Sequence, residues 1–105
     1  MTLVPRKPRE SPAQRVDKWP GPTTGQADVD VARHLASNLT SALAGRSTRQ
    51  AATLTGVDAT TIQDILNGQV WPDSRTIALL EAGLDADMWP AGIARQSSAQ
   101  QGTGQ

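Results

Sequence analysis

The sequence predicts an all-α fold, a compact bundle of four to five short helices. Apolar residues recur every four positions between Val31 and Leu43, which is typical of a helix with one buried face. Later stretches begin at a Ser or Asp that suits a helix N-cap. They end at a Gly, which readily adopts the left-handed backbone found after helices. Together these signals divide the middle of the chain into short helices.

The first helix is predicted from about Asp28 to Leu43. Its apolar stripe has a spacing of four residues and consists of Val31, Leu35, Leu39 and Leu43. Asp28 and Asp30 suit the positive end of the helix dipole. His34 is expected on or beside this helix as an ordinary boundary residue, because no second metal ligand or catalytic base accompanies it.

Residues 47–68 predict two more helices, joined by a tight turn at Gly56. Ser47 is the expected N-cap of the first, and Gln50 can reach back to the Ser47 N–H to complete a capping box. The apolar side chains of this helix are mostly small, which allows a neighbouring helix to pack closely: Ala51, Ala52 and Leu54.

The second helix of the pair is expected from Ala59 to about Asn67, with Asp58 as its N-cap and Gly68 as its end. Helical spacing places three apolar side chains on its inward face: Ile62, Ile65 and Leu66. The outward side chains are then polar or small: Ala59, Thr60, Gln63, Asp64 and Asn67.

A fourth helix is expected from Ser74 to about Ala82, capped by Asp73 and ended by Gly83. Trp71 is expected to be buried between this helix and the one before it. The core is completed in this prediction by Ile77, Leu80 and Leu84. Residues 85–89 are expected to form one last short turn or helix, in which the large side chains cover the open side of the bundle: Met88 and Trp89.

Residues 1–26 form a Pro-rich basic arm, which we expect to be disordered or loosely attached because its prolines prevent a long helix. The arm is either a solubilising tail or a DNA-binding segment, and the second alternative uses Arg6, Lys7 and Arg9. Trp19 is expected to dock on the folded domain or to stack in a complex. The domain is expected to span residues 27–93, followed by a disordered polar tail at 94–105.

The composition argues against several classes of function. The formal net charge is zero, so no global field attracts the chain to nucleic acid or to a membrane. With no Cys and one His, the chain has no cluster of metal ligands and no nucleophile paired with a base. We therefore expect no metal, no cofactor and no enzyme activity. No apolar run approaches the ~20 residues of a membrane span. No secretory signal is visible, so a cytoplasmic location is expected.

The run from Gly56 to Gly68 resembles the recognition-helix segment of the Cro/C1-type (XRE-like) helix-turn-helix DNA-binding domains. The likeness is greatest to short repressors of actinobacteria and their phages, and it covers roughly residues 28–90. Further motifs are similar to that family: Trp71-Pro72-Asp73, Thr76-Ile77, Leu80-Glu81 and Trp89-Pro90. The resemblance implies a lambda-repressor-like bundle that places the helix at residues 59–67 in the major groove.

By position, the resemblance implies base contacts from Asp58, Ala59, Thr60, Gln63 and Asp64. It implies DNA backbone contacts from Ser47, Thr48 and Asn67, and Arg49 can reach a phosphate from the same region. The chemistry of two of these residues fits independently, because Gln pairs with adenine at two points and Thr contacts thymine. Asp64 departs from the family's usual Arg, Gln or Ser. It either accepts from cytosine N4 or forms an ion pair with Arg49 or Arg75.

These observations predict a sequence-specific, double-stranded DNA-binding transcriptional regulator. The expected role is that of a repressor, with phage immunity as one form of it. The alternative is an antitoxin or a protein-interaction module built on the same fold. The residues after position 90 leave no room for a dimerisation domain. We therefore expect a monomer or a weak homodimer on a short DNA operator.

Overall fold

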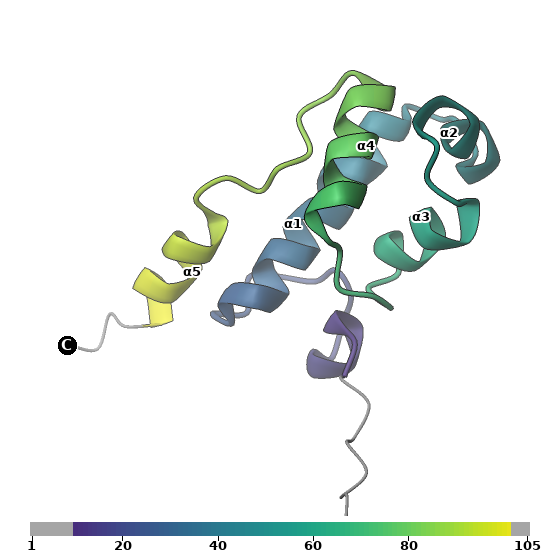
Figure 1. Ribbon diagram of the computed structural model, residues 1–105. Coiled ribbons are helices and arrows are strands. Elements are labelled where there is room, and N and C mark those ends of the chain that lie inside the picture. The colour runs from purple at the N-terminus through teal and green to yellow at the C-terminus, as the bar shows by residue number, and fades with distance from the viewer. Residues whose placement is uncertain (1–9, 102–105) are drawn as a thin grey trace, which may run out of the picture.

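Residues 10–101 are described by the computed structural model, and over that range the secondary structure is entirely helical (Figure 1). A 3₁₀ helix, η1 (Pro12–Arg15), precedes five α-helices: α1 (Ala27–Leu43), α2 (Thr48–Thr55), α3 (Ala59–Leu66), α4 (Ser74–Leu84) and α5 (Ile93–Gln101). The predicted all-α class is confirmed for this part of the chain, and four of the five α-helices, α1 to α4, lie close to their predicted positions.

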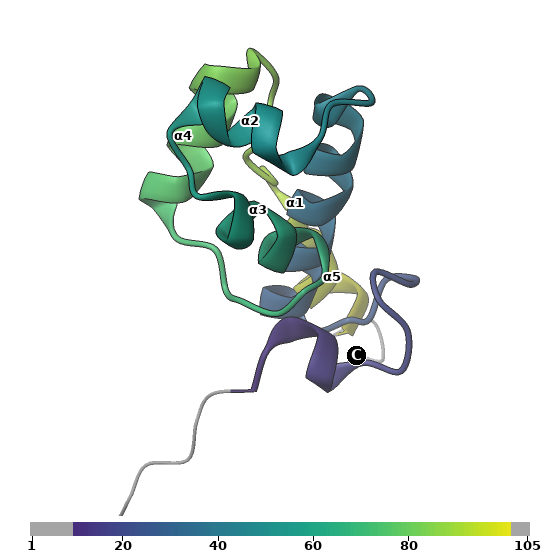
Figure 2. The same cartoon turned by 90° about the vertical axis from the view of Figure 1, so that its right-hand side faces the viewer.

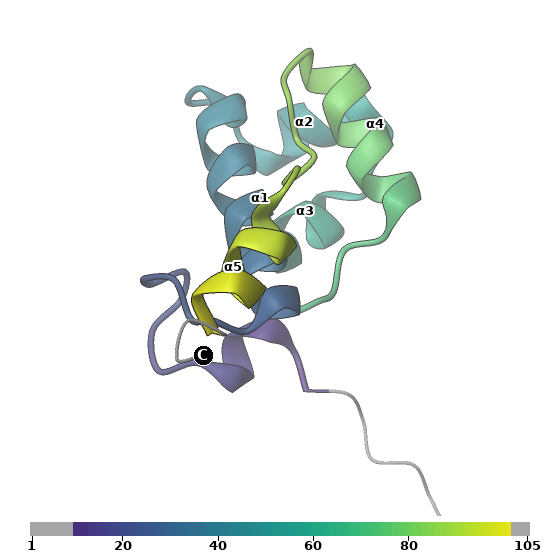
Figure 3. The ribbon, with the colours of Figure 1, turned by 90° about the vertical axis from the view of Figure 1, so that its left-hand side faces the viewer.

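Helix α1 lies at the centre of the bundle. It packs against α3, α4, α5 and η1, whereas α2 packs against α3 and α4. Figures 2 and 3 show that α2 and α3 lie on one side of α1 and that α5 lies on the other. The core between these helices consists of Leu35, Leu39, Leu43, Ala51, Val57, Ile62, Ile65, Ile77, Leu80, Leu84 and Met88. The apolar stripe predicted for the first helix therefore faces the other helices from Leu35 onward.

Helix caps form where the sequence predicts them. Ser47 Oγ accepts the Gln50 N–H at 3.1 Å, and the Ser47 N–H donates to Gln50 Oε1 at 2.8 Å, which completes the capping box of α2. Asp73 caps α4 by accepting the Thr76 N–H at 2.8 Å. That hydrogen bond lowers the pKa of the Asp73 carboxyl. Caps are local signals, and this is why they could be recognised without the tertiary structure.

Residues 10–26, which we call the strap, pack against the bundle, so the expected disorder of the arm is wrong for this stretch. Arg15 forms a 2.7 Å ion pair with Asp28 on α1. The Trp19 indole N–H donates to the Leu66 carbonyl of α3 at 2.9 Å, which confirms that Trp19 docks on the folded domain. The strap is held by separate polar contacts and has no periodic apolar face, so hydrophobic periodicity does not reveal it. Residues 1–9 lie outside the described part of the chain, and so do the three cations predicted to contact DNA there.

Helix α5 replaces the expected disorder of the tail as far as residue 101. Of the short turn or helix expected at residues 85–89, only a turn at Asp85 forms, and the chain then continues as a loop. Ser97 on α5 is 2% exposed, and its hydroxyl donates to the buried carboxylate of Asp30 on α1. The tail was expected to be disordered because it has few apolar residues. A hydrogen bond to a buried carboxylate anchors α5 instead, and composition does not predict such an anchor. Residues 102–105 lie outside the described range.

Gly83 lies within α4 and does not end it, contrary to the prediction. A Cβ atom at this position would lie 2.6 Å from the Leu54 carbonyl oxygen and from the Thr55 Cα of α2. The missing side chain therefore lets α2 and α4 approach each other closely. Helix α4 continues to Leu84 and ends at Asp85, which adopts a left-handed φ of 51°.

The tryptophans differ in part from their expected positions. Trp71 is half-buried and is not enclosed between α3 and α4: its indole N–H donates to the Glu10 carbonyl at 2.7 Å, and the Arg15 guanidinium lies 5.6 Å from the ring centroid. Met88 is fully buried, as expected, but Trp89 is 45% exposed. Within residues 10–101, every helix is too short or too polar to cross a membrane.

Candidate nucleic-acid interface

The turn between α2 and α3 has a defined backbone geometry. Gly56 has a left-handed φ of 78°, as predicted, and its N–H donates to the Ala52 carbonyl at 2.9 Å. Thr55 is buried, and its hydroxyl donates to the Ala51 carbonyl at 2.8 Å and accepts the Val57 N–H at 3.0 Å. Thr55 therefore joins the end of α2 to the turn. This role is not visible in the sequence, because a single Thr at a helix end has no distinctive signal.

Helix α3 has one buried face and one exposed face (Figure 2). Ile62 and Ile65 are at most 2% exposed, as predicted, and Leu66 is half-buried against the core. Thr60 and Gln63 are exposed, and no hydrogen bond joins either side chain to another described residue. These two polar side chains are therefore available to a partner outside the protein.

The residues predicted to contact the DNA backbone lie at the start of α2 and just after α3. Ser47, Arg49 and Asn67 are exposed, and Thr48 is half-buried. Ser47 Oγ already accepts the Gln50 N–H. Its own O–H is left to donate, for example to a phosphate oxygen. The arm residues predicted for the same purpose fall in residues 1–9.

The two acidic side chains of the proposed interface have different surroundings. Asp58 is the N-cap of α3 and accepts the Thr60 N–H at 3.0 Å, as predicted. Asp64 is half-buried, as is Ala59, although both were predicted to face outward. Neither of the two ion pairs formed by the described residues includes Asp64. The ion pair with Arg49 or Arg75 that the sequence left open is therefore not formed.

Charge is distributed unevenly between residues 1–9 and residues 10–101. All ten acidic residues lie in residues 10–101, with seven of the ten basic residues. The described part of the chain therefore has a formal excess of three negative charges, and residues 1–9 have an excess of three positive charges. Helix α3 itself contains no Lys or Arg. An attraction to phosphate must therefore come mainly from groups outside α3.

The strap contacts the loop that follows α3. The Glu10 carbonyl accepts from Trp71, and the Ala13 N–H donates to the Gly68 carbonyl at 2.8 Å. Gly68 lies two residues after the last residue of α3. The described part of the strap therefore begins, at Glu10, beside the loop that follows α3.

A buried carboxylate on α1, Asp30, holds the strap and α5 together away from this face. It is fully buried and accepts from the Thr24 N–H and hydroxyl at 2.9 and 2.8 Å, and from the Gly25 N–H at 3.1 Å. It also accepts from the Ser97 hydroxyl and, at 3.5 Å, from Arg33 Nε. Burial opposes ionisation, but the hydrogen bonds from Ser97, Thr24 and Gly25 hold the pKa of Asp30 down to about 2. The position of Asp30 in the sequence predicts only a helix-dipole role, because its hydrogen-bond donors are not evident from the sequence.

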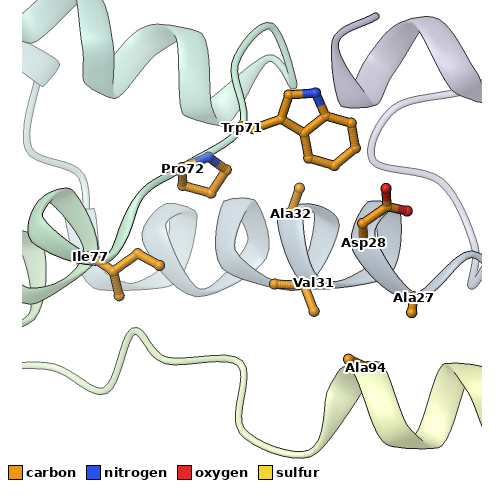
Figure 4. Close-up of a pocket in the computed structure, with 8 residues that line it drawn as sticks. All are labelled: Ala27, Asp28, Val31, Ala32, Trp71, Pro72, Ile77 and Ala94. Atoms are coloured by element: carbon orange, nitrogen blue, oxygen red, sulfur yellow. The ribbon is translucent and has the colours of Figure 1, made fainter. Parts of the chain in front are cut away.

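A mostly apolar pocket beside Trp71 and Pro72, in the loop after α3, has a volume of about 360 Å³ (Figure 4). It is lined by Ala27, Asp28, Val31, Ala32, Trp71, Pro72, Ile77 and Ala94. Figure 4 shows the indole nitrogen of Trp71 pointing away from Val31 and Ala32. Partial burial alone raises the pKa of Asp28 at its rim, but the hydrogen bonds from Arg15 and the Val29 N–H and the charge of Arg15 together outweigh this effect and lower the pKa. This cavity contains none of the residues predicted to contact DNA.

Among the described residues, no cluster of three or more His and acidic side chains could hold a metal ion. Comparisons of the chain with protein-family models, curated proteins and solved structures find no match. The resemblance of residues 28–90 to Cro/C1-type domains therefore stays a prediction from the motif.

Proposed function

We propose that this chain is a sequence-specific, double-stranded DNA-binding transcriptional regulator that acts as a repressor and contacts bases with α3. The observation that best supports the proposal is the exposed face of α3. Thr60 and Gln63 lie there on a short, capped helix, and no other described side chain occupies their hydrogen-bonding groups. A helix in the major groove needs such side chains, because base edges present paired donors and acceptors.

The remaining contacts of the proposal follow from the ends of α2 and α3. Ser47, Thr48 and Arg49 begin α2, and Asn67 follows α3, so phosphates on either side of the groove are the proposed partners of these groups. Asp58 and Asp64 favour a site with cytosine nearby, since a carboxylate accepts from cytosine N4. A lambda-repressor-like arrangement of the bundle is part of this proposal.

The charge distribution supports separate roles for two parts of the chain in DNA binding. Residues 1–9 have three uncompensated positive charges, and the bundle has three uncompensated negative ones. Lys and Arg contacts to phosphates supply the sequence-independent part of affinity. We assign that part mainly to Arg6, Lys7 and Arg9, and the sequence-dependent part to α3.

The regulatory role is inferred from the resemblance. A fold alone does not determine whether a regulator represses or activates. The short repressors that the motif resembles support repression, with phage immunity as one form, and a cytoplasmic location. A monomer or weak homodimer at a short operator is the proposed assembly.

A fluorescence anisotropy titration tests the proposal. The labelled duplexes are the DNA upstream of the protein's own gene and a scrambled duplex of equal length and composition, each at several salt concentrations. Binding to the upstream duplex alone, retained near physiological salt, is expected, and the saturation point gives the stoichiometry. Equal binding to both duplexes that is abolished by salt contradicts an autoregulating repressor.

A protein-interaction module, including an antitoxin, is the second candidate. The negative excess of residues 10–101, together with an Asp64 that forms no ion pair with another described residue, favours a basic protein partner over phosphate. A pull-down with the chain as bait, compared with a Thr60→Ala/Gln63→Ala double variant, distinguishes this alternative. A protein partner lost in the double variant, without DNA binding by the wild type, would support it.

A further inference from the structure

The C-terminal end of α3 is completed by the strap. The last carbonyls of a helix have no partner within the helix and need donors from elsewhere. In α3, the Leu66 carbonyl accepts from the Trp19 indole N–H at 2.9 Å, across 47 residues of sequence. Two positions further, the Gly68 carbonyl accepts from the Ala13 N–H at 2.8 Å. Two donors of the strap therefore bind carbonyls on either side of Asn67.

The Trp19 ring also packs directly on Gly68. Gly68 is buried and has a φ of 68°, and a Cβ atom at this position would lie 2.5 Å from Cε2 of Trp19. The ring thus occupies the space that any other residue would need for its side chain. Gly68 has two roles at once: it adopts the left-handed backbone after α3, and it admits the indole.

We propose that Trp19 is a positioning residue for the recognition helix, and that the strap is part of the DNA-reading unit. This inference rests on the proposed function. Trp19 caps the Leu66 carbonyl and supports Gly68, so it fixes the last turn of α3 and the exposed Asn67 between them. Asn67 is a predicted phosphate contact, and Gln63 lies one helical turn before it. A displaced last turn therefore alters both the backbone contact and the orientation of a base-reading side chain.

The test uses Trp19 variants of the full chain in two measurements. Amide hydrogen exchange of the free protein reports on the last turn of α3, at residues 65–69, relative to α1. Anisotropy reports the ratio of affinities for the upstream and scrambled duplexes. Trp19→Ala is expected to accelerate exchange at residues 65–69 selectively and to reduce the affinity ratio about tenfold, the size of one base contact. Trp19→Phe keeps the ring and removes the N–H, so partial recovery of both quantities is expected.

A second variant approaches the same contact from the other side. Gly68→Ala displaces the indole without removing it and should reproduce the effects of Trp19→Ala. Gly45→Ala is its control, because Gly45 also has a positive φ, of 85°, but nothing lies within 4 Å of its Cβ position. Trp89→Ala, at a partly exposed tryptophan outside α3, is the control for loss of an indole. Both controls should keep wild-type exchange at residues 65–69 and the wild-type affinity ratio.

The outcomes separate this inference from the proposed function. Wild-type exchange and an unchanged affinity ratio in Trp19→Ala overturn the inference, as does an acceleration equal in α1 and α3, which indicates general destabilisation. If the wild type prefers neither duplex, the proposed function fails. The exchange data alone then decide whether Trp19 caps α3.

Discussion

The hydroxyl of Ser97 donates a 2.5 Å hydrogen bond to the carboxylate of Asp30, across 67 residues of sequence. Both residues are at most 2% exposed. The same carboxylate accepts three hydrogen bonds from Thr24 and Gly25 of the strap. One buried charge on α1 therefore holds the two segments that were expected to be disordered. A buried charge stabilises a fold only when its hydrogen bonds are satisfied, and here several donors satisfy it.

Asp30→Asn is expected to destabilise the protein by roughly 2–4 kcal/mol. The Asn side chain keeps the shape of Asp, but its NH₂ group faces hydrogen-bond donors, and the charge-assisted hydrogen bonds are lost. Urea unfolding measures the change. Asp28→Asn is the matched control: Asp28 is 57% exposed and pairs with Arg15 at the surface, so its loss should cost less than about 1 kcal/mol. Equal effects of the two substitutions would contradict the role assigned to Asp30.

Stability is expected to fall in acid because of the same carboxylate. The pKa of Asp30 is about 2 in the folded chain against an ordinary value of 3.8, so the unfolded chain binds the proton first as the pH falls. The stabilisation is complete at a pH above the pKa of the unfolded chain. It is lost as the pH falls through the pKa of the folded chain, and it amounts to about 2 kcal/mol. Unfolding free energies at pH 7, 4, 3 and 2 measure it as the difference between wild type and Asp30→Asn. A difference independent of pH would contradict the depressed pKa.

Local features of the fold could be predicted from the sequence, and features that depend on distant contacts could not. The capping box of Ser47 and Gln50 involves four consecutive residues, so its pattern is visible in the chain. The contacts of Ser97 and Trp19 join residues far apart, and neither has a periodic signal. For the candidate interface, the exposure of Thr60 and Gln63 followed from helical spacing. The support of α3 by the strap did not, because a Pro-rich stretch is equally typical of a free tail.

The role of Gly83 also depends on a distant contact that the sequence does not reveal, and a substitution at this position tests that role. Gly→Ala within a helix ordinarily stabilises it by about 1 kcal/mol. In Gly83→Ala the added Cβ meets the backbone of α2 at 2.6 Å, so we expect destabilisation by roughly 1–3 kcal/mol, the cost of overpacking. Thermal unfolding measures the sign. Ala82→Gly, at the exposed neighbouring position, should destabilise the protein, as replacing Ala by Gly in a helix ordinarily does. A stabilised Gly83→Ala would mean that α2 and α4 can separate at little cost.

The basic residues before the strap are expected to determine the salt dependence of DNA binding. Replacing Arg6, Lys7 and Arg9 together by Gln leaves the strap intact and removes three potential phosphate contacts. The slope of log K against log salt for duplex DNA should become less steep by up to about 2.7, at roughly 0.9 per contact. Arg95→Gln, on α5 at the opposite side of α1 from α2 and α3, should leave the slope unchanged. An unchanged slope in the triple variant would assign the phosphate contacts to the bundle itself.

Substitutions of exposed side chains on α3 should change base preference, whereas substitutions of buried ones should change stability. Gln63→Ala and Thr60→Ala are expected to relax preference at one or two base pairs, since each side chain is proposed to contact its own base. Their unfolding free energies should change by less than about 0.5 kcal/mol, because both residues are exposed. Ile62→Ala is the opposite case: the side chain is fully buried, and its truncation should cost roughly 2–5 kcal/mol. Binding to a set of single-base operator variants, measured beside thermal unfolding, tests both expectations. If Gln63→Ala kept the wild-type preference at every base pair, then α3 would not lie in the groove with this face toward the bases.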